Sequence, residues 1–253
     1  GIHSLRAQEN FPITGQRLHP KMIESLAHVK KACAEANRQA GVVPEPVALA
    51  IEQACDEILE GRFRDQFIVD PVQGGAGTST NMNANEVIAN RAIEILGGTK
   101  GDYTLVSPND HVNRGQSTND VYPSCGRMTA YVLMGNLLKA LDGLIAAFHK
   151  KAEEFDGVIK MGRTQLQDAV PMRLGQEFQA YARVMEREKG RLVRARDEML
   201  ALNLGGTAIG TRLNAHPVFV ERVVPILAEQ TGIPFVKCED LIDGTQNADA
   251  YPA

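Results

Sequence analysis

The sequence predicts an all-α protein: a short-helix N-terminal domain followed by part of a long-helix bundle. Apolar residues recur at helical spacing through most of the 253 residues. Two segments keep such a pattern for roughly 30 residues, well beyond the average helix of about 11–12. Proline and glycine also gather at the ends of the patterned segments, as they do at helix boundaries. We place the domain boundary near residue 115, with an N-terminal domain at 1–115 and an incomplete helical-bundle domain at 116–253.

The N-terminal domain is predicted to contain three short helices. The first spans residues 19–41, with a proline at its start and a glycine at its end. The second spans 46–59, and the third spans about 81–96, closed by the pair Gly97-Gly98. Residues 67–69 (FIV) form either a short strand or a buried extended segment.

The second domain is predicted to be built on two long helices. Residues 120–155 keep a wide apolar face, and Pro123 falls in the first turn, where proline is tolerated. Residues 172–202 are rich in good helix formers. Between these helices we expect an irregular polar loop at 157–171, and after a glycine-rich turn a shorter helix at 217–230.

The composition excludes several classes of function. A net charge of −4 and a pI near 5.9 lack the basic signature of a nucleic-acid-binding protein. The four cysteines have no Cys-x-x-Cys spacing, which favours reduced, buried thiols over a zinc site. No uninterrupted apolar run approaches the roughly 20 residues of a membrane span, and the first residues lack the apolar core of a signal peptide. We therefore expect a cytoplasmic protein without nucleic-acid or membrane partners.

Three short segments combine glycine with hydroxyl and amide side chains. We call them cassette 1 (residues 77–83, GTSTNMN), cassette 2 (115–120, GQSTND) and cassette 3 (162–168, GRTQLQD). None contains a nucleophile–base pair or a metal cluster, but each offers several neutral hydrogen-bond donors, which suit carboxylates. Cassettes 1 and 2 also precede predicted helices, whose first N–H groups attract anions. Two such sites without a cationic motif between them fit a ligand with two carboxylates.

Each cassette also has a purely structural interpretation. The hydroxyl and amide side chains of cassettes 1 and 2 are those that cap helices, and Asn83 and Glu86 stand at capping-box spacing. In cassette 3 the arginine and the aspartate suit an ion pair. Thr164 and Gln165 have no capping task in a loop, so they are the better functional candidates.

Together these segments resemble the aspartase/fumarase superfamily, and the likeness runs nearly end to end. The segments that carry it are 77–87 (GTSTNMNANEV), 108–113 (PNDHVN), 116–120 (QSTND) and 162–168 (GRTQLQD). Within the superfamily the chain is most similar to the aspartate ammonia-lyases. Ser79-Thr80 and Ser117-Thr118 stand where fumarases usually carry Gln-Ser and Ser-Ser, and Gln165 stands where fumarases have histidine.

The resemblance implies a carbon–nitrogen lyase that reversibly eliminates ammonia from L-aspartate to give fumarate, through an aci-carboxylate intermediate. It implies substrate contacts for six residues: Thr78, Ser117, Thr118 and Thr164 with the β-carboxylate, and Asn119 and Gln165 near the departing amino group. It also implies a homotetramer whose active sites combine cassettes from different subunits, with no cofactor required.

The chain departs from the family pattern in one large respect. It lacks the mobile loop Gly-Ser-Ser-x-Met-Pro-x-Lys-x-Asn, which supplies the serine base and the groups that hold the α-carboxylate. We therefore assign no catalytic residue and no metal ligand in this chain, and expect a truncated chain that cannot turn over aspartate alone. Two smaller departures are Ser107, where a histidine is common, and Arg212, where a small residue is expected. The alternatives are a fumarate hydratase and a non-catalytic helical oligomerisation or binding fragment.

Overall fold

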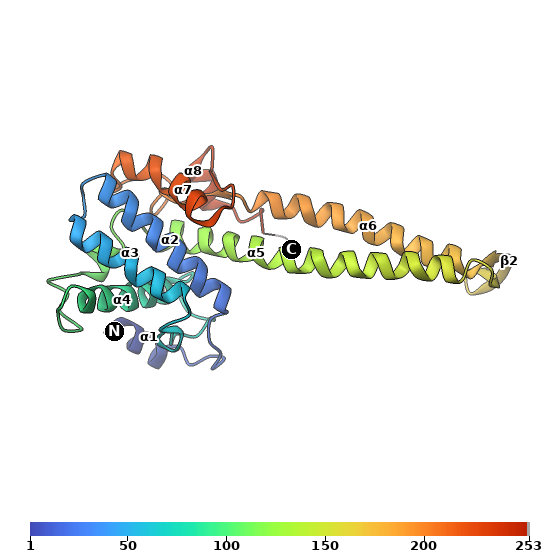
Figure 1. Cartoon of the computed structure of the whole chain (residues 1–253), viewed down its shortest axis with the longest axis horizontal. Coiled ribbons are helices and arrows are strands. Elements are labelled where there is room, and N and C mark those ends of the chain that lie inside the picture. Colours follow the sequence, from blue (N-terminus) through green and yellow to red (C-terminus); the bar gives the residue numbers. More distant parts are fainter. Residues whose placement is uncertain (252–253) are drawn as a thin grey trace. The chain divides into compact units, whose positions relative to one another are not determined.

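The computed structural model describes residues 1–251 and confirms the all-α prediction, since its strands are few and short (Figure 1). The chain divides into two compact units. Unit 1 comprises residues 1–130 together with the chain from residue 199 onward, and unit 2 comprises residues 131–198. The division of the whole protein near residue 115 stays a prediction.

Unit 1 is a cluster of short helices in which α2 packs against three others. Its helices are α1 (Ile2–Asn10), α2 (Pro20–Gln39), α3 (Glu45–Leu59), α4 (Thr78–Ile95), α7 (Pro217–Thr231) and α8 (Leu241–Gln246). α2 packs against α3, α4 and α7. Its inner face carries Leu26, Val29 and the small residues Ala32 and Ala36, each 0% exposed. Small side chains at a helix contact let the axes approach closely, so α2 can bury most of its length in the core.

The helices predicted for the sequence of unit 1 are present, with small shifts at their ends. α2, α3 and α7 correspond to the predicted helices at 19–41, 46–59 and 217–230. Residues 67–69 are the buried extended segment and not a strand, with Phe67 and Val69 each 1% exposed. The short helices α1 and α8 were not predicted, nor was the parallel pair of β3 (Ala201–Leu202) and β4 (Val236–Lys237).

Helix α5 (Thr118–Glu154) confirms the predicted long helix and contributes residues to both units. It begins before the predicted start, so Pro123 lies in its second turn and not in its first. There the proline leaves the carbonyl of Asn119 without its helical N–H partner. The Nδ2 of Asn203 donates to that carbonyl at 3.0 Å, and Ser124 Oγ donates to Asn203 Oδ1 at 3.2 Å. A buried asparagine from another segment thus replaces the missing helical bond.

Unit 2 is an antiparallel helix pair made of the rest of α5 and α6 (Leu174–Glu198). A ring cluster joins the two helices, with centroid separations of 5.3–6.3 Å among Phe148, Phe155, Phe178 and Tyr181. The start of α6 comes very close to the end of α5, because a Cβ at Gly175 would lie 2.3 Å from the carbonyl oxygen of Ala152. Glycine is therefore required at that crossing.

A β-hairpin replaces the irregular polar loop predicted at 157–171. Strands β1 (Ile159–Thr164) and β2 (Gln167–Arg173) pair antiparallel, so α6 also begins later than predicted. The two residues of the turn, Gln165 and Leu166, both have positive φ (50° and 65°), as a tight hairpin turn requires. The sequence offers none of the Asn-Gly or Gly-Gly signals of such a turn, which is why the pattern predicted a loop.

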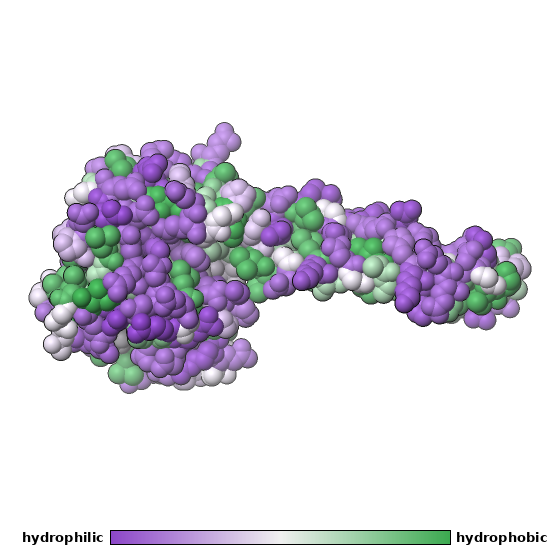
Figure 2. All heavy atoms as spheres, in the orientation of Figure 1, coloured by the Kyte–Doolittle hydropathy of each residue, from purple (hydrophilic) through white to green (hydrophobic). Residues whose placement is uncertain are grey.

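Helix α5 is also long and apolar enough, by length and composition alone, to cross a membrane. Its exposed apolar residues include Leu137 and Leu144, at 50% and 44%. Lys139 and Asp142 share the same stretch, and Asp142 forms an ion pair with Lys189 of α6. Figure 2 shows apolar and polar side chains interspersed along this helix pair. Such mixing is typical of a helix that packs against other helices in water.

Gly77→Ala is expected to destabilise unit 1 more than a matched glycine substitution. Gly77 has φ 89°, and a Cβ there would lie 2.5 Å from the ring of Tyr122; Gly97, at the other end of α4, has φ 82° and open space around it. Backbone strain alone costs about 1 kcal/mol, and overlap with a packed ring adds roughly 1–3 kcal/mol. Urea unfolding of both variants measures the difference. Equal losses would show that the tyrosine moves aside freely.

Candidate functional site

Cassette 1 is not a side-chain cap, which corrects the structural interpretation of that segment. The N-cap of α4 is Gly77, in the left-handed conformation and without a side-chain hydrogen bond. Asn83 lies inside the helix, where its amide binds the backbone of residues 66–69. Glu86 is 0% exposed and accepts hydrogen bonds from the start of α1. Both side chains hold other segments onto α4 and form no capping box.

The hydroxyl side chains of cassette 1 divide between surface and interior. Thr78 is exposed, and its hydroxyl donates to the carbonyl of Gly75 at 2.6 Å. Ser79 is half-buried. Thr80 is fully buried and exchanges hydrogen bonds of 2.7 and 2.8 Å with the amide of Gln73. In the first turn of α4, Thr78 is therefore exposed and Ser79 partly so, while Thr80 fixes the preceding loop.

Cassette 2 does cap its helix. The Oγ of Ser117 accepts from the N–H of Asn119 at 3.3 Å, and the N–H of Ser117 donates to Asp120 Oδ1 at 2.9 Å. Capping uses a lone pair of the serine oxygen and leaves the hydroxyl hydrogen to donate. Ser117 and Thr118 are half-buried, and Asn119 is exposed with its Nδ2 donating to the carbonyl of Ala208 at 2.8 Å. Capping and ligand binding are thus compatible here.

Asp120 ties cassette 2 to the turn of residues 203–214. Its buried carboxylate accepts from the N–H groups of Gly205 and Thr207, each at 3.0 Å, in addition to Ser117. Burial raises the pKa of this carboxyl to about 6, although the N–H donors and the charge of Lys30 oppose that rise. The start of α5 and the glycine-rich turn are therefore held as one piece.

A cavity of about 400 Å³ lies between cassette 2 and this turn. Its lining consists of Gly115, Gln116, Ser117, Thr207, Ala208, Ile209, Thr211, Leu213 and Asn214. The sequence marks the turn by its glycines but does not indicate that it faces cassette 2. Arg212 has φ 64°, in the left-handed region that favours glycine, which explains why a small residue is expected there.

Cassettes 1 and 2 meet through buried amides. The Nδ2 of Asn81 donates to Thr118 Oγ1 and to Asn113 Oδ1, each at 3.2 Å. Asn113 Oδ1 also accepts from the Nζ of Lys30 at 2.9 Å, and Lys30 donates to Gln116 Oε1 at 2.8 Å. Sequence reasoning missed the lysine. Its signal is a cation within the apolar pattern of α2 that turns out to be 0% exposed.

Cassette 3 belongs to unit 2 and lies at the tip of the β1–β2 hairpin. Its predicted ion pair is confirmed: Arg163 and Asp168 face each other across the strands, with Nε and Oδ1 3.0 Å apart. Both side chains are exposed, so the pair contributes little stability. Thr164 and Gln165 are exposed beside the turn. Their meeting with cassettes 1 and 2 at one substrate stays a prediction.

The polar groups of cassettes 1 and 2 are hydroxyls, amides and backbone N–H groups. Such donors bind anions at a helix start. Within residues 1–251 no group of three or more His, Cys, Asp or Glu side chains is arranged to hold a metal ion. The donor set is one that suits the binding of anions such as carboxylates.

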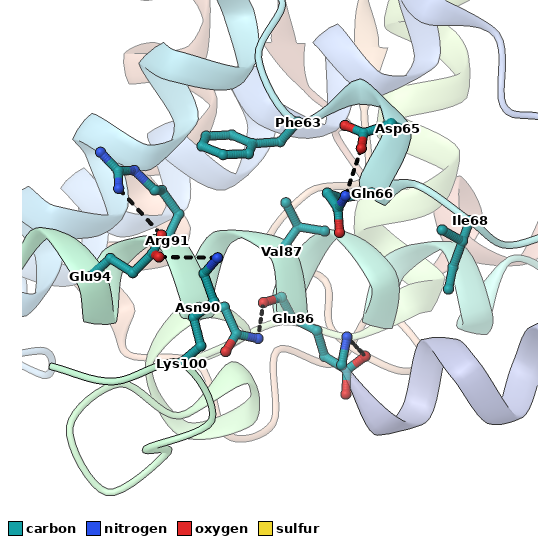
Figure 3. Close-up of a pocket in the computed structure, with 11 residues that line it drawn as sticks. Phe63, Asp65, Gln66, Ile68, Glu86, Val87, Asn90, Arg91, Glu94 and Lys100 are labelled. Atoms are coloured by element: carbon teal, nitrogen blue, oxygen red, sulfur yellow. Dashed lines mark hydrogen bonds and ion pairs between the residues drawn. The ribbon is translucent and has the colours of Figure 1, made fainter.

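A separate cavity of about 470 Å³ opens beside α4, and its residues include Phe63, Asn90, Arg91, Glu94 and Lys100 (Figure 3). Its cations are already paired: Arg91 and Lys100 lie 3.3 and 3.1 Å from the carboxylate of Glu94. None of the predicted site residues lines it. The cassettes remain the candidate site.

The chain was compared with known proteins. A family model described as lyase matches residues 1–252. Aspartate ammonia-lyase from Bacillus subtilis is 57% identical over 99% of this chain and 53% of its own length, and that from Escherichia coli K12 is 48% identical with the same coverage. The chain thus spans about half the length of the curated relatives it matches.

Solved structures of fumarate lyases and fumarases are also similar to this chain. A fumarate lyase from Brucella melitensis, bound to cobalt, superposes with a TM-score of 0.96 at 48% identity and covers 99% of this chain and 55% of its own. A class II fumarase from Schistosoma mansoni superposes with a TM-score of 0.93 at 32% identity, covering 99% of this chain and 56% of its own.

Asp120→Asn is expected to change how stability depends on pH. The folded-state pKa of about 6 lies above the ordinary 3.8, so this group's contribution to stability is complete below about pH 4 and is lost as the pH rises through about 6. Between about pH 4.5 and 7 the free energy of unfolding should fall by roughly 1–3 kcal/mol in the wild type relative to the variant. Urea unfolding at both pH values measures this change. A difference that stays constant over this range would contradict the prediction.

Proposed function

The chain belongs to the lyase family, whose model matches residues 1–252, and we propose that the whole protein is an aspartate ammonia-lyase. The reaction is the reversible elimination of ammonia from L-aspartate to give fumarate. The superfamily resemblance seen in the cassettes is confirmed. The choice among its members is supported by aspartate ammonia-lyases at 48–57% identity, against 32% for the Schistosoma mansoni fumarase.

The observation that carries the proposal is the hydrogen bond between Asn81 and Thr118, which joins the helix starts of cassettes 1 and 2. In this elimination a base removes a proton from C3, and negative charge develops on the β-carboxylate before ammonia leaves. Preorganised neutral donors stabilise such charge without reorganising during the reaction. Thr78, Ser117, Thr118 and Thr164 would bind the β-carboxylate, and Asn119 and Gln165 would lie near the amino group.

No residue of this chain is assigned as the base. The Gly-Ser-Ser-x-Met-Pro-x-Lys-x-Asn motif does not occur in its 253 residues. In the proposed enzyme these cassettes form the substrate cradle, and the base acts on a substrate that the cradle holds.

A homotetramer with shared active sites is part of the same proposal. The helix pair of unit 2 leaves large apolar side chains uncovered, among them Leu137, Leu144, Tyr181 and Val193 at 38–50% exposure. Two helices cannot bury such faces by themselves, whereas a bundle of several pairs can. In this assembly cassette 3 of one subunit would reach cassettes 1 and 2 of others. A cytoplasmic location is also proposed, and the free, buried thiols of Cys33, Cys55 and Cys125 support it.

The proposal is tested by substrate choice. The whole protein is expected to form fumarate from L-aspartate and not from L-malate, followed by ultraviolet absorbance of the fumarate double bond, and the 253-residue chain alone is expected to form none. Turnover of malate with aspartate inert would favour the fumarate hydratase. Inactivity of the whole protein toward both substrates would favour the third alternative, a non-catalytic role in oligomerisation or binding.

Thr164→Val in the whole protein is expected to lower kcat/KM for L-aspartate by a factor on the order of 10²–10³, because one preorganised donor to the developing charge is lost. Thr99→Val, at an exposed position in unit 1, is the matched control and should leave the rate unchanged. A near-normal rate for Thr164→Val would return cassette 3 to a structural role.

A further inference from the structure

A buried cation lies behind the contact between cassettes 1 and 2. Lys30 is 0% exposed, and its ammonium donates to two amide oxygens, Asn113 Oδ1 at 2.9 Å and Gln116 Oε1 at 2.8 Å. Burial lowers its pKa to about 8, so the group is still charged at neutral pH. Its hydrogen-bond partners are neutral, although the buried carboxylate of Asp120 also attracts it, and burying a charge costs free energy. A cation kept there, next to a candidate site, calls for a functional explanation.

The ammonium determines which way the two amides face. It carries only donors, so each amide must turn its oxygen toward it. The other ends of the amides agree: Asn113 Nδ2 donates to the carbonyl of Gln116 at 3.3 Å, and Gln116 Nε2 donates to the carbonyl of Val112 at 2.9 Å. Asn113 Oδ1 is thereby held as an acceptor, and the Nδ2 groups of Asn81 and Asn85 both face it at 3.2 Å.

Asn81 transmits this orientation to Thr118. Its Nδ2 donates to Thr118 Oγ1 as well as to Asn113 Oδ1, while its own Oδ1 is buried without a hydrogen-bond partner in the part of the chain that the structure describes. Turning the amide of Asn81 would let its oxygen accept from the Thr118 hydroxyl. The same turn would set two acceptor oxygens, those of Asn81 and Asn113, against each other. The orientation that leaves Oδ1 unsatisfied therefore persists because Lys30, together with the carbonyl of Gln116, holds Asn113.

The hydroxyl group of Thr118 is the last member of this chain of hydrogen bonds. Since Thr118 Oγ1 accepts a bond from the interior, its hydroxyl hydrogen is free to donate on the side away from Asn81. Thr118 is half-buried, so part of its surface is accessible.

We propose that Lys30 is a positioning residue, which orients Asn113 and Asn81 so that the Thr118 hydroxyl donates its hydrogen to a substrate carboxylate. The inference rests on the proposed function, in which Thr118 binds the β-carboxylate. Without the ammonium, Asn113 keeps only the longer contacts of 3.2–3.3 Å to Gln116, Asn81 and Asn85, so its amide turns more easily and Asn81 can turn with it. Thr118 then donates inward to Asn81 Oδ1, and the substrate loses a donor although Thr118 itself is unchanged.

The test compares Lys30→Met with Lys31→Met in the whole protein. Lys31 follows in the sequence but forms a surface ion pair with Asp56 at 2.6 Å. Lys30→Met is expected to lower kcat/KM for L-aspartate by a factor on the order of 10², with only a modest fall in melting temperature, because removal of a buried charge offsets the loss of the donor to Gln116 Oε1. Lys31→Met is expected to keep wild-type activity. Wild-type kcat/KM in Lys30→Met would overturn the proposal.

A double-mutant cycle separates positioning from general damage. Thr118→Val alone is expected to cost a similar factor, but in the Lys30→Met background it should cost less than about threefold more, because the hydrogen has already turned inward. If the loss of kcat/KM in the double variant equals the product of the losses in the two single variants, the proposal is overturned.

The same double-mutant cycle is repeated with the dissociation constant of succinate as the readout. Succinate is a dicarboxylate whose binding can be measured without turnover. Succinate binding without aspartate turnover would contradict the proposed function and leave the cycle decisive for Lys30. Failure of the wild type to bind succinate would overturn both.

Asn81→Asp provides a second variant if Lys30→Met does not fold. Its carboxylate can only accept, so it draws the Thr118 hydrogen inward while Lys30 stays in place. The expected result is the same loss of kcat/KM and the same lack of additivity with Thr118→Val. Full activity in Asn81→Asp would overturn the proposal.

Discussion

The need to satisfy buried polar groups at the start of α5 is the constraint on which the candidate site depends. Pro123 leaves the carbonyl of Asn119 without its helical partner, and the side chain of Asn203 donates a hydrogen bond to it. Asp120 binds three backbone N–H groups, one in cassette 2 and two in the turn of residues 203–214. Asn81 reaches the same place from α4. Leaving any one of these groups unpaired costs about 1–3 kcal/mol, so the segments that supply the partners are held together.

Apolar packing and polar bonding have different tasks in unit 1. The small residues on α2 bring the helices close, which fixes where α3, α4 and α7 lie. Packing alone does not decide which end of an amide faces a hydroxyl. The buried ammonium of Lys30 bears on that choice, because an ammonium only donates and its partner amides must turn their oxygens toward it. Orientation of neutral donors is what stabilisation of developing charge requires.

In unit 2 the dominant feature is exposed apolar surface and not buried polar groups. Its aromatic cluster joins the two helices, but many apolar side chains along them stay exposed. At the end of the pair the hairpin exposes Thr164, the last residue of β1, and Gln165, which forms the tight turn with Leu166. A rigid turn is a better support for substrate contacts than the irregular loop that the sequence pattern predicts.

Helical periodicity and boundary signals were enough to predict the helical class and the positions of α2, α3, α5 and α7, and the resemblance of the cassettes to a known superfamily predicted the family. These properties are local, since they depend on residues a few positions apart. The hairpin was not predicted, because its turn lacks glycine. The predicted capping box of Asn83 and Glu86 was wrong, because both side chains bind distant segments. Only the tertiary structure decided that Lys30 is buried and that Asn81 meets Thr118. Those contacts join residues 37 or more positions apart, and no local pattern specifies the partner of a buried polar group.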